Sequence, residues 1–346
     1  MTERFITKVQ GGSVRIYRIE TQVFPHLSGY VYLVLGDDFS PVLIDAGSGE
    51  LDSPREILSG LEQIAPDFGE RFVPSDIETI LLTHAHIDHF GGANELARRL
   101  KAQVACHRFD SRIIESFSER ASVANARYVT FLAEMGVESE KIDPILRGFG
   151  FLPGRVRSTP VDRTLDDGDA VGPFRVHYFP GHSAGAIALQ IGDYLISGDL
   201  LLAKTLTQIW PERIMPQTGL IRYLESIEKL RALLKTRLNQ RQPLTLLPGH
   251  EASIPEPLKR IELVVQSTAR RNDRLLTILN RSDSAMTCSE LARRLYLTTH
   301  ISRTFFAICD TAARLEYLQL HGLLAADNYD ELAAGKTQAV RYVARR

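Results

Sequence analysis

The chain has 346 residues, of which 44% are apolar and 24% charged, and its formal net charge is −1. This composition is ordinary for a soluble globular protein, and the length exceeds one typical domain. No run of 18 or more apolar residues occurs, which argues against a membrane span, and the N-terminus opens no long apolar run, so we expect no signal peptide. Three cysteines without paired spacing suit a reducing compartment, so we expect a cytoplasmic protein.

Residues 12–45 alternate apolar and polar side chains with turn residues between the runs, which predicts a series of antiparallel strands. Asp45 follows the last apolar run of this series, Val42-Leu43-Ile44. Ser53 to about Ile64 then has helical periodicity, with Ser53 as the expected N-cap and Pro54 at the first helical position.

A histidine-rich loop follows the next apolar run, Ile80-Leu81-Leu82, and reads Thr83-His84-Ala85-His86-Ile87-Asp88-His89. In an extended segment, residues two apart point the same way, so His84 and His86 can bind one metal ion. Asp88 and His89 point elsewhere and can supply a second ion. This density of nitrogen and carboxylate ligands favours zinc over a surface loop rich in histidine by chance.

Further candidate ligands stand at the ends of later apolar runs. They are His182 after Phe179-Pro180-Gly181, Asp199 after Ile196-Ser197-Gly198, and His250 after Leu247-Pro248-Gly249. The additional strands that we predict are residues 77–82, 103–106, 161–165, 174–179, 188–191 and 194–196. Strands and helices in alternation predict a sheet covered by helices.

Two segments between these motifs are candidates for substrate contacts. Residues about 108–150 form a helical insertion with scattered aromatic side chains, which either cap the site or build the core of the insertion; both interpretations are open. We single out Arg127 and Tyr128 there. A loop over residues 204–218 contains Trp210 and begins near Asp199, which makes it a second candidate. An amphipathic helix is expected over residues 219–236.

The character of the chain changes near residue 256. Residues 257–346 hold 14 Lys and Arg against nine Asp and Glu, whereas residues 1–256 hold 27 against 33. Three helices are predicted near residues 258–280, 287–297 and 302–320, the second with a capping box at Thr287, followed by a hairpin of residues 323–327 and 339–343. Three helices and a hairpin resemble a winged-helix module, so we expect two domains, 1–256 and 257–346.

The ordered set of Asp45, the His84–His89 cluster, His182, Asp199 and His250 resembles the metallo-β-lactamase-fold hydrolases over roughly residues 12–255. The resemblance implies an α+β fold of the αββα sandwich type. It implies that His84, His86 and His182 hold one zinc, that Asp88, His89 and His250 hold a second, and that Asp199 bridges them. It also implies that Asp45 supports these loops without binding metal. In many relatives a second histidine follows the glycine after the fourth motif histidine, whereas Ala186 follows Gly185 here.

The resemblance implies a dinuclear-zinc hydrolase, with iron or manganese as alternative metals, in which a metal-bridging hydroxide oriented by Asp88 attacks the substrate. Our first expectation is a small ester, thioester or lactone. The alternative is a metal-dependent phosphodiesterase or ribonuclease, suggested by the basic tail, and the third is a mononuclear-iron persulfide dioxygenase. We expect a small-molecule substrate and a homodimer as one option, while nucleic-acid binding by Arg293, Arg294 and neighbouring arginines is not favoured.

Overall fold

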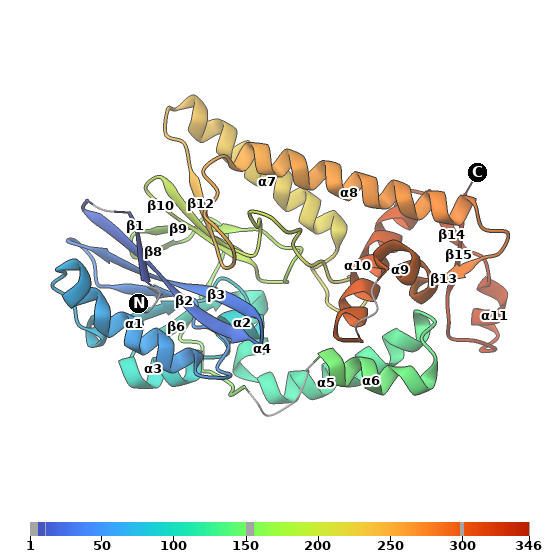
Figure 1. The fold of residues 1–346 in the computed structure, drawn as a ribbon, viewed down its shortest axis with the longest axis horizontal. Helices are drawn as coiled ribbons and strands as arrows, with labels where there is room; N and C mark the ends of the chain where they lie inside the picture. The colour runs from blue at the N-terminus through green and yellow to red at the C-terminus, as the bar shows by residue number, and fades with distance from the viewer. Residues whose placement is uncertain (1–5, 11, 150–155, 298–300, 346) are drawn as a thin grey trace. The chain divides into compact units, whose positions relative to one another are not determined.

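The computed structural model describes residues 6–10, 12–149, 156–297 and 301–345. The chain divides into two units (Figure 1), and each is described by itself. Unit 1 comprises residues 1–120, 154–207 and 230–257, and unit 2 comprises residues 121–153, 208–229 and 258–346. No helix among the described residues has both the length and the apolar character needed to cross a bilayer.

Unit 1 contains two sheets with a shared core. The first sheet has seven strands in chain order: β1 (Ile6–Gln10), β2 (Val14–Phe24), β3 (Leu27–Gly36), β4 (Val42–Ile44), β5 (Thr79–Leu81), β6 (Gln103–His107) and β7 (Arg163–Leu165). The second has five strands, in the order β12 (Thr245–Pro248), β11 (Tyr194–Gly198), β10 (Ile187–Ile191), β9 (Phe174–Tyr178) and β8 (Ala170–Val171). One buried cluster takes side chains from both sheets, so the sheets pack face to face.

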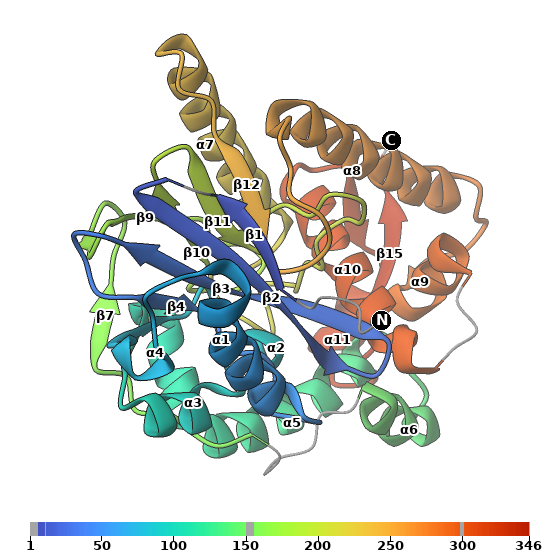
Figure 2. The same cartoon turned by 60° about the vertical axis from the view of Figure 1, so that its left-hand side comes forward.

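Helices cover the outer face of the first sheet (Figure 2). They are α1 (Ser53–Phe68), α2 (Ile87–Phe90), α3 (Ala93–Leu100) and α4 (Arg108–Glu115), with the short 3-10 helix η1 (Pro74–Asp76) between α1 and β5. Helix α1 packs on β2, where a Cβ on Gly60 would lie 2.8 Å from Ile19. The αββα expectation is confirmed for this side of the sandwich. Helix α7 (Leu220–Asn239) contributes its second half to unit 1, and Arg237 there donates to the Asp193 carboxylate at 2.9 Å.

The start of α1 differs from the prediction. Asp52, and not Ser53, holds the N-cap position. The Ser53 side chain is fully buried, and its Oγ lies 3.0 Å from the hydroxyl of Thr21. The Ser53 hydroxyl therefore pairs with Thr21 on strand β2, whereas the sequence pattern predicted that it would cap the helix. Pro54 stands in the first turn as expected.

Unit 2 has its own core, built from three separate segments of the chain. It contains most of α5 (Phe117–Glu134), from Ala121 onward, together with α6 (Ser139–Phe149), the first half of α7, α8 (Pro257–Asn280), α9 (Cys288–Tyr296), α10 (Ile301–Leu320) and the short α11 (Tyr329–Ala333). A small antiparallel sheet joins β13 (Met286–Thr287), β15 (Arg341–Ala344) and β14 (Leu324–Ala326) in that order. The three expected helices and the expected hairpin are present, and Thr287 and Glu290 form the predicted capping box.

The division of the core differs from the expected boundary at residue 256. Residues 121–149 and 208–229, which that boundary assigns to the first domain, pack with the C-terminal segment. Backbone hydrogen bonds join them: Ser289 N–H donates to the Met135 carbonyl at 2.8 Å, and Val340 N–H donates to the Glu134 carbonyl at 2.9 Å. The insertion and the tail therefore share one core. Residues 150–155, at and just beyond the end of the predicted insertion, lie outside the described residues.

Removing residues 258–346 is expected to make the protein aggregate or lose its cooperative thermal unfolding. Phe131, Leu132 and Met135 are at most 2% exposed and share one buried cluster with side chains of α8, α9 and α10, so truncation is expected to expose apolar surface there. Size-exclusion chromatography and thermal unfolding of the truncated chain test this. A truncated chain that stays monodisperse with an unchanged Tm would show that the shared core contributes nothing to stability.

Candidate metal centre

Five loops at the carboxyl ends of strands bring the predicted ligands together in unit 1. The loop after β5 leads through His84 and His86 into the single-turn helix α2, which holds Asp88 and His89. The loop between β9 and β10 holds His182, Asp199 directly follows β11, and His250 follows β12. Asp45 follows β4 with a positive φ of 63°. All seven predicted ligands are thereby gathered at one end of the two sheets.

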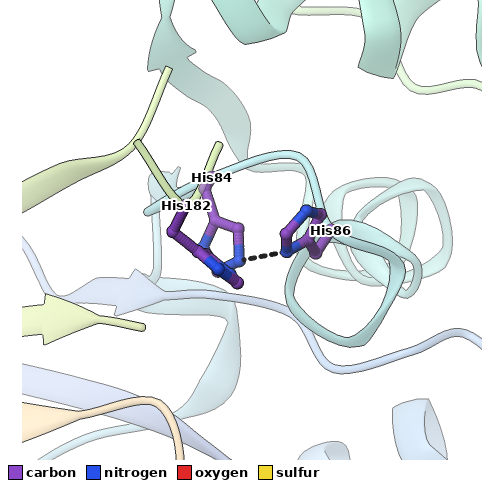
Figure 3. A group of neighbouring side chains, drawn as sticks. All are labelled: His84, His86 and His182. Atoms are coloured by element: carbon purple, nitrogen blue, oxygen red, sulfur yellow. Dashed lines mark hydrogen bonds between the residues drawn. The ribbon is translucent and has the colours of Figure 1, made fainter. Parts of the chain in front are cut away.

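Three histidines form the first group (Figure 3). His84, His86 and His182 each offer one nitrogen, and these nitrogens lie within 4.8 Å of one another. His84 Nε2 and His86 Nδ1 are 3.1 Å apart, the pair joined by the dashed line in Figure 3. His84 and His86, on either side of Ala85, therefore lie close enough to bind one metal ion, as the sequence predicted.

The second group contains Asp88, His89 and His250, whose ligand atoms also lie within 4.8 Å of one another. Asp199 lies between the two groups. Its carboxylate oxygens are 3.6 Å from His182 Nε2, 3.6 Å from His89 Nε2 and 3.7 Å from His250 Nε2. One carboxylate therefore faces ligands of both groups, as a bridging ligand would.

These separations fit a shared ion better than direct hydrogen bonds. Nitrogen and oxygen atoms 3.6–3.7 Å apart are too distant to be hydrogen-bonded. A tetrahedral zinc ion with ligands at about 2.0–2.1 Å would hold neighbouring ligand atoms roughly 3.3 Å apart. His89 Nε2 and Asp199 Oδ1 are also buried without a hydrogen-bond partner. The donor set of five imidazoles and two carboxylates therefore fits two divalent cations.

Burial and neighbouring charge set the protonation of these ligands. Burial lowers the pKa of His84 well below its usual value and that of His86 to about 3, so both rings are neutral and have a lone pair for a metal. Burial alone would raise the pKa of Asp88, but His89 and His250 lower it to about 2. Burial alone would lower the pKa of His250, but Asp199 and Asp88 raise it to about 9. The carboxylates thus attract positive charge, and a dication can replace the protons of these histidines.

Hydrogen bonds fix the ring orientation of the second group. Asp45, 2% exposed, accepts from His89 Nδ1 at 2.8 Å and from the backbone N–H of Thr83 at 2.8 Å. His250 Nδ1 donates to the Ser28 carbonyl at 2.7 Å. In both histidines the second nitrogen, Nε2, is thereby directed at the carboxylates. Such partners fix the ring tautomer and raise the basicity of the ligand nitrogen.

The three residues singled out for substrate binding lie in unit 2. Tyr128 and Trp210 are each 6% exposed and belong to its hydrophobic core, with ring centroids 5.1 Å and 5.9 Å from that of Phe305. For Tyr128, packing favours the core interpretation that the sequence left open for the insertion. Trp210, predicted to contact substrate from the 204–218 loop, also packs in this core. The side chain of Arg127 is exposed on α5, and its role in substrate binding stays a prediction.

One carboxylate that contacts the ligand loops was not predicted. Asp110 is fully buried in the first turn of α4 and accepts hydrogen bonds from the β5–α2 loop and the β9–β10 loop. Burial raises its pKa to about 6, so it is ionised at neutral pH and above. The only sequence signal is an aspartate shortly after a buried strand, which is common in proteins without such a role.

Comparisons with known proteins agree with this geometry. The family model described as "Metallo-beta-lactamase superfamily" matches residues 25–250. A Bacillus subtilis protein named probable metallo-hydrolase YqjP is 26% identical over 294 residues, which cover 84% of this chain and 87% of the relative. A hydroxyacylglutathione hydrolase of Buchnera aphidicola is 22% identical over 204 residues, which cover 58% of each chain. A solved structure of a metallo-beta-lactamase family protein from Thermus thermophilus has a TM-score of 0.72 at 23% identity and covers 95% of this chain and 98% of that chain, which shows a common fold.

Proposed function

Because this chain belongs to the metallo-beta-lactamase superfamily and is a metal-dependent hydrolase, we propose that it uses two zinc ions to hydrolyse a small ester, thioester or lactone. The observation that carries the proposal is the arrangement of Asp199 between two ligand groups. In the proposed assignment His84, His86 and His182 would hold the first ion. Asp88, His89 and His250 would hold the second ion, and Asp199 would bind both ions.

Two bound zinc ions would lower the pKa of a bound water to about 7 and would stabilise negative charge on the substrate oxygen. The protein's own contribution begins with the buried imidazoles, which stay neutral. Asp88 is 15% exposed at its side chain, so it can be reached by an attacking water. As an ionised carboxylate it can accept a hydrogen bond from that water and orient it toward the substrate.

No side-chain nucleophile is needed for this reaction. Among the described residues, the candidate metal ligands that gather at the site are histidines and aspartates, with no cysteine. The one cysteine of unit 1, Cys106, is fully buried, and burial raises the pKa of its thiol well above its ordinary value. A thiolate mechanism therefore has no support, and activation of water is the chemistry that the donor set favours.

Two observations favour an acyl substrate. A relative is named a hydroxyacylglutathione hydrolase, and a hydroxyacylglutathione is a thioester. Residues 1–256 hold 27 basic against 33 acidic residues, so a polyanion would approach against the overall field. Cytoplasmic location and a homodimer stay predictions. The three cysteines, all free and buried, are compatible with a reducing compartment.

Elemental analysis is expected to find close to two zinc ions per chain in protein purified without chelator. The purified enzyme should then hydrolyse at least one substrate in a panel of thioesters, esters and lactones. One iron per chain, with activity insensitive to changes at Asp88 and His250, would replace this proposal by the mononuclear dioxygenase alternative. Manganese or iron at two equivalents would change the metal and leave the reaction class in place.

The alternative, a ribonuclease guided by the basic tail, meets an obstacle within unit 2. In a winged-helix module the third helix enters the nucleic-acid groove. If the tail is such a module, that helix is α10. Every residue from Ala307 to Leu315 is buried, and α10 packs against α6 and α9. The helix that would read a groove is covered by its own unit, so we favour a packing role for the tail.

Salt dependence separates the two functions. A ribonuclease that contacts several phosphates loses affinity with a slope of about 0.7 in log K per contact on single strands. We expect acyl hydrolysis to change little between about 50 and 200 mM salt, and Arg293→Glu with Arg294→Glu to leave it unchanged. Salt-sensitive cleavage of single-stranded RNA that this double substitution suppresses, with no acyl turnover, would establish the ribonuclease.

A further inference from the structure

The loops that carry the first group of histidines are far apart in sequence and converge on one buried carboxylate. His84 and His86 flank Ala85, and His182 is followed by Ser183 and Gly185. The Asp110 carboxylate accepts from Ala85 N–H at 2.7 Å, from Gly185 N–H at 2.8 Å and from the Ser183 hydroxyl at 3.0 Å. Asp110 Oδ2 accepts from the Ala85 N–H, and Oδ1 accepts from the Gly185 N–H.

The Asp110 side chain is closely packed. The residue is 0% exposed. A Cβ on Gly185 would lie 2.5 Å from Asp110 Cγ and 2.7 Å from its Oδ1, so only glycine at position 185 lets the carboxylate approach the backbone this closely. The absence of a side chain at Gly185 is therefore explained by Asp110.

From this arrangement we infer that Asp110 is a positioning residue for the first metal ion, acting on His84, His86 and His182 through the backbone of the two loops. The inference rests on the proposed metal centre. Asp110 itself contacts none of the three imidazoles in the hydrogen bonds above. It sets the distance between the loop of His84 and His86 and the loop of His182, and hence how closely the three ligand nitrogens approach.

The arrangement parallels that of Asp45. Asp45 accepts from Thr83 and from His89 Nδ1 and so supports the second group. Asp110 supports the first group at Ala85 and Gly185. A further backbone link between the two loops is the bond from Ile187 N–H to the Thr83 carbonyl at 2.9 Å, one residue before His84. Asp110 binds Ala85, on the other side of His84, so the loop that carries His84 is held at both Thr83 and Ala85.

Asp110→Asn is the direct test, because asparagine keeps the shape but turns an NH2 group toward an N–H donor. The affinity of the first zinc site, measured by competition with a chromophoric chelator, should fall about 10–100-fold, with the second site little changed. The d–d absorption of cobalt(II) in the first site should change as well, a signature that loss of fold stability alone would not produce. Asp166→Asn is the matched control, since its carboxylate is half exposed and pairs with Arg108 at 3.0 Å.

Gly185→Ala should reproduce the loss from the other side of the contact, and the double variant should lose little more than either single variant. If Asp110→Asn fails to fold, Ser183→Ala tests the inference instead, because it removes one hydrogen bond to Asp110 and keeps both backbone donors. We expect Ser183→Ala to lower the zinc affinity of the first site by a smaller factor. Unchanged zinc affinity and an unchanged cobalt spectrum in the folded variants would overturn the inference. Wild-type protein that binds no divalent metal would instead overturn the proposed function.

Discussion

Asp88→Asn is expected to lower kcat/KM by at least about 100-fold on whichever substrate the enzyme turns over, with the fold intact. Asp88 Oδ2 lies 3.2 Å from His250 Nε2 and 3.9 Å from His89 Nε2, so the carboxylate belongs to the second ligand group. The amide is a weaker ligand and brings no negative charge. The change also replaces one carboxylate oxygen, which could accept from the attacking water, with an NH2 donor.

The measurement is steady-state kinetics together with metal content and circular dichroism. Asp37→Asn is the control, because this exposed carboxylate pairs with Arg15 at 2.8 Å and stands outside the ligand groups. If Asp88→Asn keeps wild-type rates while two metal ions remain bound, Asp88 neither orients the water nor holds a metal that the reaction needs.

Gly249→Ala is expected to have an effect of similar size for a steric reason. A Cβ at this position would lie 2.4 Å from His89 Cε1 and 3.0 Å from Asp199 Oδ1. The methyl group must therefore displace a ligand of the second ion or the carboxylate between the two groups. We expect metal content to fall from two ions to about one or fewer, and activity to fall with it by about 100-fold or more.

Gly192→Ala provides the comparison. Its φ of 53° makes alanine strained, at a cost of roughly 1 kcal/mol, but no atom lies within 4 Å of the added Cβ. That variant should have a slightly lower Tm with full metal content. Gly249→Ala with two bound ions and normal turnover would show that the His89–Asp199 spacing tolerates the methyl group.

The ligands were predictable because each combines a metal-binding side chain with a strand end. His84, His182 and His250 all follow short apolar runs, and the ends of neighbouring strands meet at one edge of the sheets. The strand pairing of residues 14–44 and the capping box at Thr287 were equally local in origin. Such features depend on residues a few positions apart, which sequence patterns record well.

What could not be predicted depends on contacts between distant segments. Asp110 is one aspartate among many until Ala85 and Gly185 are brought to it. Tyr128 and Trp210 have the same helical or loop signature whether they face a substrate or Phe305. Ser53 is a residue type that often caps helices, but its hydroxyl pairs with that of Thr21 on strand β2. In each case tertiary packing decides between two uses of the same side chain.

The division of unit 2 into three chain segments has a consequence for synthesis on the ribosome. Residues 121–149 are made early, whereas the helices α8–α10, which share one buried core with them, come from residues 257–320. At about 5–20 residues per second, Phe131 and Leu132 wait on the order of 10–40 s for their partners. The last metal ligand, His250, precedes α8, so unit 1 can fold and bind metal during this interval. Limited proteolysis of stalled nascent chains should therefore find the α5–α6 segment cleavable after the metal-binding unit has become resistant.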